Sequence, residues 1–367
     1  MSEAPALLLV AVSARALAAS ARRAGFAAIA IDAFGDVDTR AACRETVVVE
    51  HAMGGFAGVE LESVVAPLSR SHAPAGVIYG SGFDDCPSKL EALARHAPLI
   101  GCAPEALARA KDPLLFAESC ALAGLAHPEL RFAQPPDSGW LLKRGGGSGG
   151  LHIAPASAER ELAPGEYWQR RIEGRGVSLL FCRDSLALNP IAWSEQWTSP
   201  CAAWPFRFGG AAGPLEVEPG DELLAKLAAL TGTLGVRGLA SADFLDDGVR
   251  FWLLEINPRP GATLDLFDVD GDPLLKRHID AVRGVRASPP KRRAPRATEI
   301  VYAEAPCIAP GGEWPDWAAD RPAVGTPIAA GAPICTVSAR AATVPEAKAR
   351  THERARRIAA WLQEGGR

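Results

Sequence analysis

Several signatures are missing from this 367-residue sequence, and each absence excludes a class of protein. Charge of one sign is not in excess, because 39 Lys and Arg stand against 43 Asp and Glu, for a net charge of −4. A dedicated nucleic-acid binder normally carries a basic stripe, so no nucleic-acid partner is expected. No apolar run reaches the ~18 residues of a membrane-spanning helix, and the apolar N-terminal segment lacks the basic start of a signal peptide. We therefore expect a cytoplasmic protein without a membrane partner.

Paired cysteines and clustered histidines are also missing. The eight cysteines include no C-x-x-C pair and the seven histidines stand singly, so no tight metal-binding spacing is present. Free thiols, mostly buried, in a reducing compartment are the expected state. With 48% apolar residues and ~150 residues per domain, the length predicts two or three domains with ample cores.

The first hundred residues alternate strand and helix patterns. Continuous apolar runs at 7–12 and 27–32 predict strands that are buried on both faces, with a helix over 13–24 between them. Further strands are predicted at 47–49, 75–80 and 97–101, and further helices at 61–69 and 88–96. This alternation predicts a parallel, Rossmann-like sheet. The first strand-to-helix turn, VSARAL, has no glycine, so we do not expect this domain to bind NAD.

The rest of the chain is first helical and then rich in short strands. The pattern is helical from about 103 to 130, and from Trp140 to about Arg259 strands alternate with glycine-rich turns. The segment ASPPKRRAPRA (287–297) is interpreted as a solvated connector. Three tryptophans are interpreted as packing residues, with the lining of an aromatic-amine pocket as the alternative: Trp193, Trp197 and Trp204.

A glycine-rich segment, WLLKRGGGSGGLHI, carries the first chemical signal. Gly145, Gly147 and Gly150 formally match G-x-G-x-x-G, but a β-like LHI follows where a dinucleotide site needs a helix, and no Gly-Lys-Ser/Thr is present. We predict a flexible loop between two strands, entered through Lys143 and Arg144. The N–H groups of such a loop fold over phosphates while the cations neutralise them. A mobile surface hairpin is the alternative.

The segment ADFLDDGVRFWLLEINPRPGATLD carries the second signal. Its Asp-Asp-Gly turn between two apolar stretches predicts a β-hairpin. Asp243 and Glu255 are equidistant from Val249, so an odd-length loop would place the two carboxylates opposite each other on one face. Glu255 and Asn257 share a face because side chains alternate along a strand. Two carboxylates and one amide oxygen, followed by Arg259, suit Mg²⁺, which takes one or two carboxylates plus substrate phosphates. A carboxylate at a hairpin edge, without metal, is the alternative.

Together these segments resemble the ATP-grasp superfamily over nearly the whole chain. The resemblance implies an α/β (α+β) ATP-grasp fold in three parts. These are a Rossmann-like pre-ATP-grasp domain over 1–102, a small lid subdomain over 103–180, and a large subdomain over 181–367 with an antiparallel-sheet lobe and a C-terminal extension. ATP and Mg²⁺ (or Mn²⁺) are the implied cofactors. The implied metal ligands are Asp243, Glu255 and Asn257, and the implied catalytic residue is Arg259, beside the transferring phosphoryl group.

The same resemblance implies a nucleotide site. Lys111, opening a helix with Asp112, is similar to the first nucleotide lysine, and Lys143 with the glycine loop is similar to the second lysine and the phosphate lid. QRRIEG (169–174) is similar to the hinge that binds adenine through backbone groups, although Arg170 stands where many members have an acidic residue. The implied nucleotide-binding residues are Lys111, Lys143, Gly145, Gly146, Gly147, Ser148, Gly149, Gly150, Gln169, Arg170, Arg171 and Ile172.

Three further motifs, FGDVDTR, YGSGFDD and NPRPGATLD, look like those of bacterial and archaeal carboxylate–amine ligases. Some of these are associated with methanofuran-type C1 cofactor synthesis, including tyramine–glutamate ligation. The resemblance implies a ligase that joins a small-molecule carboxylate and an amine through an acyl phosphate, releasing ADP and phosphate. Ser81, Gly82 and Asp84 follow a strand end, where open α/β sheets place ligands, and are candidate substrate contacts, with a plain turn as the alternative. A homodimer is left open, since dimers are common among similar enzymes.

Two other functions remain as alternatives. The tail VGTPIAAGAPICTV is similar to the C-terminal lobe of biotin-carboxylase-like members, which favours an ATP-dependent enzyme that carboxylates with bicarbonate. The other alternative is a nucleotide-binding regulatory protein without turnover. The complete Asp–Glu–Asn–Arg set argues against this last function, because binding alone does not require all four residues.

Overall fold

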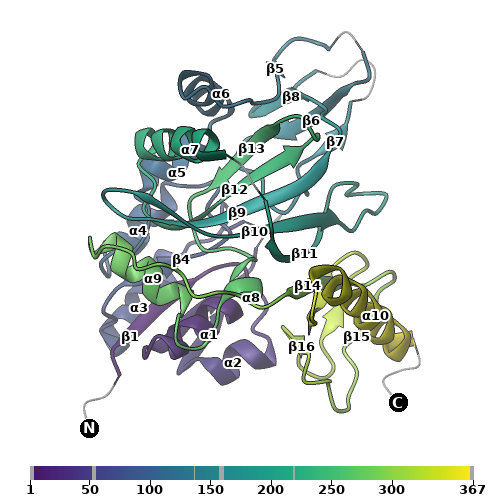
Figure 1. Cartoon of the computed structure of the whole chain (residues 1–367). Helices are drawn as coiled ribbons and strands as arrows, with labels where there is room; N and C mark the ends of the chain where they lie inside the picture. The colour runs from purple at the N-terminus through teal and green to yellow at the C-terminus, as the bar shows by residue number, and fades with distance from the viewer. Residues whose placement is uncertain (1–3, 52–54, 136, 157–160, 218–219, 364–367) are drawn as a thin grey trace.

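The N-terminal part of the chain is a parallel sheet with strand order β3-β2-β1-β4, flanked by helices (Figure 1). The computed structural model describes residues 4–51, 55–135, 137–156, 161–217 and 220–363. The strands are β1 (Ala6–Val10), β2 (Ala27–Asp32), β3 (Glu45–Val48) and β4 (Val77–Tyr79), and the helices are α1 (Arg15–Arg23), α2 (Val37–Ala42), α3 (Glu62–His72) and α4 (Lys89–Ala94). All five residues of β1 are buried, which confirms the strand predicted from its unbroken apolar run.

The sequence-based prediction of this part has two errors. The predicted strand at 97–101 is wrong, because only an isolated bridge joins Leu99 to Val77 there. Helix α2 was not predicted, although its signal is local: the Asp36 carboxylate caps the helix by accepting a hydrogen bond from the Thr39 N–H at 2.8 Å.

The turn after β1 is held by a side chain from β2. The Asp32 carboxylate accepts hydrogen bonds from the backbone N–H groups of Ala14 at 2.7 Å, Phe34 at 2.7 Å and Gly35 at 2.5 Å. In a dinucleotide-binding Rossmann domain, the amides at this turn face the pyrophosphate. Here the Asp32 carboxylate already accepts a hydrogen bond from the Ala14 N–H at the start of α1. The glycine-free turn therefore binds a side chain of the protein at the place where a Rossmann turn would bind a pyrophosphate.

Helices α5 (Pro104–Lys111) and α6 (Pro113–Leu122) lead into a small antiparallel sheet of order β5-β8-β6-β7, at the top of Figure 1. Its strands are β5 (Leu130–Arg131), β6 (Trp140–Arg144), β7 (Ala154–Pro155) and β8 (Glu166–Arg170). Trp140, Leu142 and Trp168 form its buried centre. The glycine-rich segment connects β6 to β7, as predicted. However, the LHI that follows the glycines is a turn and not a strand, because β7 begins only at Ala154.

The largest sheet is antiparallel, with order β13-β12-β9-β10-β11-β14-β18-β16. Its strands are β9 (Arg175–Arg183), β10 (Leu188–Thr198), β11 (Phe208–Leu215), β12 (Gly238–Asp246), β13 (Phe251–Asn257), β14 (Arg296–Tyr302), β16 (Ala318–Ala319) and β18 (Pro333–Arg340). The predicted domain boundary at 180/181 falls inside β9. The remaining elements are α7 (Gly220–Leu234), α8 (Leu264–Phe267), α9 (Leu274–Val282), β15 (Cys307–Ile308), β17 (Pro327–Ile328) and α10 (Val344–Gln363).

Buried clusters join these parts. Helices α1, α8 and α9 pack between the parallel sheet and the large sheet, and α5, α6 and α7 pack on the large sheet from another side. His278 of α9 connects two of the parts directly. Its Nδ1 accepts from the Leu239 N–H in β12 and its Nε2 donates to the Ile100 carbonyl, both at 2.9 Å. These bonds hold the N-terminal sheet against the large sheet.

Arg293 corrects the interpretation of 287–297 as a solvated connector. Its side chain is only 2% exposed. Its Nε donates to the Phe267 carbonyl at 3.0 Å, and its Nη1 donates to Asp272 at 2.7 Å. The connector is therefore packed at this residue, since burial of an arginine requires such partners.

The thiols agree with the expectation from the sequence. All eight cysteines are free, and five of them are buried, as predicted. No helix among the described residues is both long and apolar enough to cross a lipid bilayer.

Candidate functional site

The hairpin β12–β13 places the two predicted carboxylates opposite each other. Asp243 pairs with Glu255 in the antiparallel register, which confirms the prediction. The prediction of an odd-length loop is wrong, because Asp246 pairs with Phe251 and four residues connect them. The register shifts between Asp243 and Phe244, where Leu254 is the extra residue of a β-bulge. Bulges of this kind re-aim side chains next to active sites.

Hydrogen bonds join the predicted metal ligands into one partly buried cluster, in which the Glu255 side chain is 37% exposed. The Asp243 carboxylate accepts from Ser178 Oγ at 2.5 Å and from Asn257 Nδ2 at 2.9 Å. The Lys111 ammonium donates to Glu255 Oε2 at 2.9 Å and to Asn257 Oδ1 at 2.7 Å. The common face predicted for Glu255 and Asn257 is therefore confirmed. The Lys111 ammonium is thus hydrogen-bonded to two of the oxygens that are predicted to bind the metal.

Lys111 has a different helical position from the one expected. It is the last residue of α5 and does not open a helix. Asp112 is the residue that starts α6, since its carboxylate accepts from the Leu114 and Leu115 N–H groups at 3.0 and 2.9 Å. The ammonium thus lies at a helix C-terminus, where the helix dipole favours a cation.

Arg259 connects this cluster to the segment after β4 and to the glycine loop. Its Nε donates to Asp84 Oδ2 at 3.0 Å, and its Nη2 lies 3.4 Å from Ser148 Oγ. Lys111 Nζ lies 3.3 Å from the same Asp84 carboxylate. Asp84 follows β4, Ser148 follows β6 and Arg259 follows β13, so three distant segments meet here. Asp84 is 3% exposed and Arg259 is 6% exposed.

Ser81 and Gly82, the other candidate substrate contacts, take part in backbone contacts. The Ser81 carbonyl accepts from the Val12 N–H at 3.0 Å, and the Gly82 carbonyl accepts from the Phe56 N–H at 2.9 Å. Gly82 has a φ of +116°, and a Cβ on it would lie 2.7 Å from the Phe56 ring. A tight turn explains this glycine, whereas Asp84 alone of the three joins the charged cluster through its side chain.

Burial and charge pairing shift the pKa values in the cluster in opposite directions. For Glu255, burial opposes ionisation, but Lys111, His152 and Lys143 outweigh it and lower the pKa to about 2. For Asp243, burial and the neighbouring Glu255 raise the pKa to about 7. Burial lowers the pKa of Lys143 to about 8, and Lys111 adds to this effect. The buried Lys143 ammonium would therefore gain from a phosphate beside it, whereas the negative charge shared by Asp243 and Glu255 would gain from a cation.

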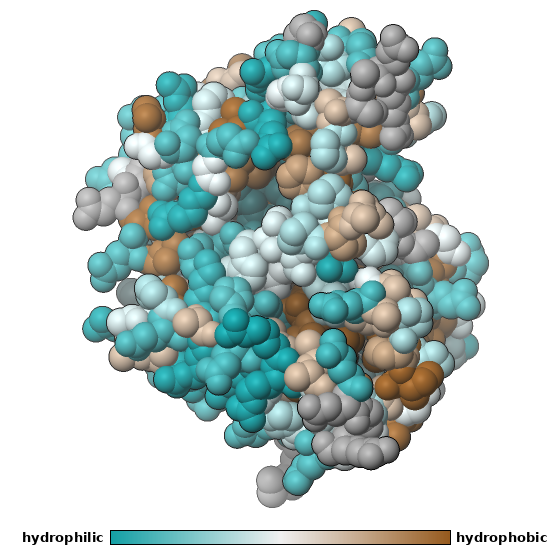
Figure 2. Space-filling model, turned by 90° about the vertical axis from the view of Figure 1, so that its right-hand side faces the viewer, coloured by the Kyte–Doolittle hydropathy of each residue, from teal (hydrophilic) through white to brown (hydrophobic). Residues whose placement is uncertain are grey.

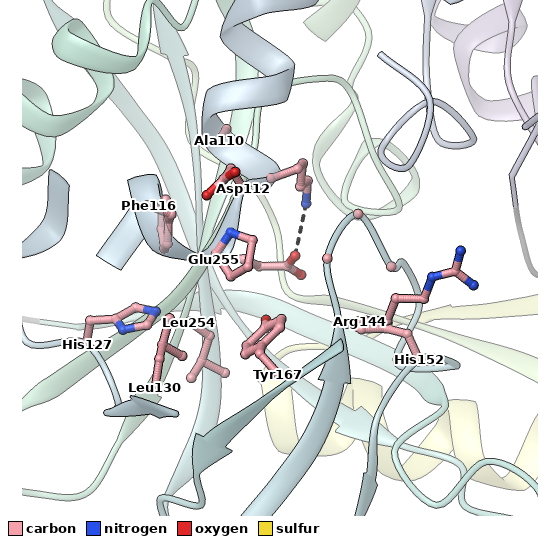
Figure 3. Close-up of a pocket in the computed structure, with 15 residues that line it drawn as sticks. Ala110, Asp112, Phe116, His127, Leu130, Arg144, His152, Tyr167, Leu254 and Glu255 are labelled. Atoms are coloured by element: carbon pink, nitrogen blue, oxygen red, sulfur yellow. Dashed lines mark hydrogen bonds and ion pairs between the residues drawn. The ribbon is translucent and has the colours of Figure 1, made fainter. Parts of the chain in front are cut away.

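A cavity adjoins this cluster between α5, α6 and the glycine loop (Figure 3). Its cavity volume is about 40 Å³, and the empty space that also includes adjoining open solvent is about 390 Å³. Glu255 and Tyr167 point toward its middle, whereas the Arg144 guanidinium points away. Figure 2 shows this side of the molecule hollowed between its top and the larger body below. The lining residues that were not predicted as site residues include Phe116, His127, His152, Tyr167 and Leu254. Only Tyr167 and Leu254 of these lie on strands, where alternation with predicted residues could have indicated them, and the other three residues carry no motif.

The glycine loop packs against two other segments. A Cβ on Gly146 would lie 2.6 Å from the Asp84 carbonyl oxygen, and a Cβ on Gly150 would lie 1.9 Å from the Phe206 carbonyl oxygen. Both glycines have positive φ angles, of +72° and +74°. The backbone here approaches its neighbours as closely as only glycine allows. Gly149 also has a positive φ, but a Cβ on it would meet nothing within 4 Å.

The predicted adenine hinge begins in β8. Gln169 is 2% exposed and shares the strand face of Tyr167. Arg170 faces the opposite way, pairing with Asp137 at 2.9 Å and lying 5.6 Å above the Trp140 ring. Two further hinge residues, Arg171 and Ile172, lie between β8 and β9. None of the four lines the cavity of Figure 3, so their contacts with a nucleotide stay a prediction.

The three tryptophans serve packing instead of lining this cavity. The Trp193 ring is 8% exposed and lies 5.6 Å from the Phe244 ring. Trp197 packs against His352 at 5.2 Å, and Trp204 lies beside Gly331.

Residues 111–263, which contain the cluster and the glycine loop, match the protein family described as ATP-grasp domain. The match spans less than half of the chain. No curated protein matches the chain in sequence.

Solved structures extend the fold similarity to nearly the whole chain. Biotin carboxylase of Campylobacter jejuni, in a β,γ-ATP complex, superimposes with a TM-score of 0.70 at 15% identity, over 94% of this chain and 89% of that one. N5-carboxyaminoimidazole synthetase of Staphylococcus aureus, complexed with ADP, gives 0.68 at 13% identity, over 97% and 98%. The biotin carboxylase domain dimer of Hydrogenobacter thermophilus 2-oxoglutarate carboxylase, with MgADP, ADP and bicarbonate, gives 0.70 at 13% identity, over 95% and 89%.

These similarities confirm the predicted α/β ATP-grasp fold, with its parallel and antiparallel sheets. At such low identity they establish the fold and not the reaction. None of the three structures singles out the tyramine–glutamate ligase branch.

Proposed function

We propose that this protein is an ATP-dependent ligase that activates a small-molecule carboxylate as an acyl phosphate and joins it to an amine, releasing ADP and phosphate. The observation that carries the proposal is the convergence of Lys111, Asp243, Glu255, Asn257 and Arg259 beside the glycine loop of an ATP-grasp domain. A nucleotide-binding protein without chemistry has no need for an arginine and three oxygen ligands held together in this way.

The donor set fits a magnesium site. Two carboxylates and an amide oxygen, on adjacent strands and free of sulfur and imidazole, are the ligands of a hard cation. No group of three His, Cys, Asp or Glu residues within the described ranges forms a metal site by itself, so substrate phosphates would complete the coordination. Asp243, Glu255 and Asn257 would hold Mg²⁺ or Mn²⁺, which when bound neutralises charge on the β- and γ-phosphates.

Other residues are proposed to bind the nucleotide. Lys111 would leave the oxygen cluster and, with Lys143, contact the phosphates, while residues 145–150 close over them. The hinge residues 169–172 would contact adenine. Three functional parts, 1–102, 103–180 and 181–367, would then surround one nucleotide.

The chemistry requires positioning more than covalent catalysis. A carboxylate is a poor acyl donor because oxide would be its leaving group. Transfer of the γ-phosphoryl group to a carboxylate oxygen creates a better leaving group, and the amine then displaces phosphate. Arg259 would stabilise charge on the transferring group, with Asp84 holding its guanidinium in place. The closed glycine loop would exclude water, which otherwise hydrolyses the acyl phosphate.

The test is ADP release from MgATP with a panel of carboxylic acids, using hydroxylamine as a general amine. At least one acid is expected to stimulate ADP release and to yield a hydroxamate. Glu255→Gln should abolish both, whereas Glu313→Gln, the same change at an exposed glutamate, should leave both unchanged. Near wild-type turnover of Glu255→Gln would refute the assignment.

A carboxylating enzyme is the second candidate. The fold shared with biotin carboxylase and with N5-carboxyaminoimidazole synthetase favours it, with bicarbonate as the carboxylate. ATP turnover that bicarbonate stimulates without any added amine would select this candidate. ATP binding without ADP formation across the whole panel would instead indicate a regulatory protein.

Two finer expectations are part of the proposal. The resemblance leaves a homodimer open, and light scattering of the purified chain tests it. A role in methanofuran-type cofactor synthesis rests on the sequence motifs alone, and the test is ADP release with glutamate and tyramine.

A further inference from the structure

A second cavity, of about 300 Å³, lies between the segment after α8, the connector before β14 and the paired ends of β14 and β18. None of its lining residues belongs to the cluster around Glu255. Its charge is unusual, because four arginines and two aspartates line it. The charged residues are Arg292, Arg293, Arg296, Arg340, Asp268 and Asp270.

The two aspartates do not neutralise these arginines. Asp268 pairs with Arg23 at 2.7 Å and also accepts hydrogen bonds from Ser20 Oγ and the Leu274 N–H. Asp270 pairs with the same Arg23, at 3.2 Å. Both carboxylates thus share one cation from α1, which does not line the cavity. Arg293 is paired with Asp272 at 2.7 Å, so the excess positive charge of the lining belongs to Arg292, Arg296 and Arg340.

Two of the arginines face each other across adjacent strands. Arg296 and Arg340 are direct partners in the antiparallel register of β14 and β18. Like charges directly opposite each other destabilise a sheet, so this pair is unfavourable unless an anion lies between them. Burial lowers the pKa of Arg296, and Arg340, Arg15 and Arg23 lower it further, while Asp265 opposes the shift.

Several guanidinium nitrogens also lack acceptors. Arg293 Nη2 and Arg296 Nε are buried and have no hydrogen-bond partner among the described residues. Within the same ranges, no ion pair involves the side chain of Arg292 or of Arg340, and both residues are exposed at the cavity rim. These two buried nitrogens are not accessible from the cavity, so a ligand would contact the exposed guanidinium groups of Arg292 and Arg340.

We propose that this cavity is a binding site for a phosphate group, separate from the nucleotide site. Adjacent guanidinium forks match the geometry and charge of a phosphate dianion, which accepts several charge-assisted hydrogen bonds at once. The cavity is larger than one phosphate requires, so there is room for a phosphate monoester as well as for the free ion. The site is built from residues 292–296 and 340, which the proposed ligase chemistry does not use.

The experiment is calorimetric titration of the full chain with inorganic phosphate and, separately, with ribose 5-phosphate, at constant ionic strength set by chloride. Saturating MgADP fills the proposed nucleotide site during both titrations. One additional site is expected, and Arg340→Gln should weaken its affinity about tenfold or more, as loss of a hydrogen bond to a charged group does. Arg286→Gln, at an exposed arginine outside the cavity, is the matched control.

Thermal unfolding tests the proposal independently of the titration. Arg340→Gln removes one of two facing like charges, so its thermal midpoint in phosphate-free buffer should equal or exceed that of the wild type. Phosphate should raise the midpoint of the wild type and of Arg286→Gln, but not that of Arg340→Gln. Tighter binding of ribose 5-phosphate would identify an organic phosphate as the ligand, and equal binding would identify the free ion. Equal phosphate affinity of Arg340→Gln and wild type, or no binding beyond that of chloride, would overturn the proposal.

Discussion

Replacing Asp84 by asparagine tests whether the segment after β4 positions Arg259. The Asp84 carboxylate lies 3.0 Å from Arg259 and 3.3 Å from Lys111, and burial encloses all three side chains. In the wild type, burial raises the pKa of Asp84, but Arg259 and Lys111 outweigh it and hold the pKa below its ordinary value. Asparagine keeps the shape and one acceptor oxygen but removes the charge.

The expected loss in the free energy of unfolding is about 3 kcal/mol. Removing one partner of a buried ion pair costs about 3–5 kcal/mol, because the other charge stays buried and unpaired. The lower end applies because Lys111 keeps Glu255 as a partner at 2.9 Å and because the introduced amide oxygen still accepts one hydrogen bond from Arg259.

Urea unfolding at pH 7 measures this loss. Asp85→Asn is the matched control, since the neighbouring side chain is exposed and surface changes cost within about 0.5 kcal/mol. A double-mutant cycle with Arg259→Gln should give a coupling energy of about 2–3 kcal/mol. A loss below about 1 kcal/mol for Asp84→Asn, or additive effects in the cycle, would refute the positioning of Arg259 by Asp84.

Three further predictions concern the pH dependence of stability, the glycine loop and the second lysine. Burial lowers the pKa of His278 to about 4, below its value in the unfolded chain. The contribution of the neutral, buried imidazole to the free energy of unfolding is therefore complete above pH 6.5 and is lost as the pH falls toward 4. Urea unfolding from pH 7 to 4 should show about 3 kcal/mol less loss for His278→Gln than for the wild type, and equal losses would contradict the assignment. Gly150→Ala should destabilise the protein by about 1–2 kcal/mol more than Gly149→Ala, because only a Cβ at position 150 meets the Phe206 carbonyl. Equal unfolding midpoints of the two variants would argue against a closely packed loop. Lys143→Met should stabilise the protein by about 2–3 kcal/mol, because it removes a desolvated ammonium with a pKa of about 8. The same change should raise the KM for ATP about tenfold. An unchanged KM would exclude a contact between Lys143 and a phosphate.

Local patterns predicted the parts of the fold that depend on neighbouring residues. The unbroken apolar run of β1 predicts a strand buried on both faces, and strand alternation predicts that Glu255 and Asn257 share a face. Both predictions are confirmed. The hairpin register was predicted correctly from a wrong loop length, because a bulge at Leu254 compensates for the even loop. Such a bulge depends on packing beyond the hairpin and has no signal in the sequence.

Long-range contacts were beyond the reach of the sequence. Asp84 and Arg259 are separated by 175 positions, and nothing in either motif indicates their ion pair. Arg293 was interpreted as solvated because its neighbours are proline and arginine, yet tertiary contacts with Phe267 and Asp272 bury it. Tyr167 lines the cavity from a strand without any motif. In each case the deciding partner lies on another element.

The fate of a carboxylate oxygen tests the central claim most directly. An acid that supports ADP release is supplied with ¹⁸O in its carboxylate, and the released phosphate is analysed by mass spectrometry. Activation as an acyl phosphate predicts one ¹⁸O atom in each phosphate, because the oxygen that attacks the γ-phosphoryl group leaves with it. Phosphate without ¹⁸O, formed together with ADP and coupled product, would contradict the proposed mechanism.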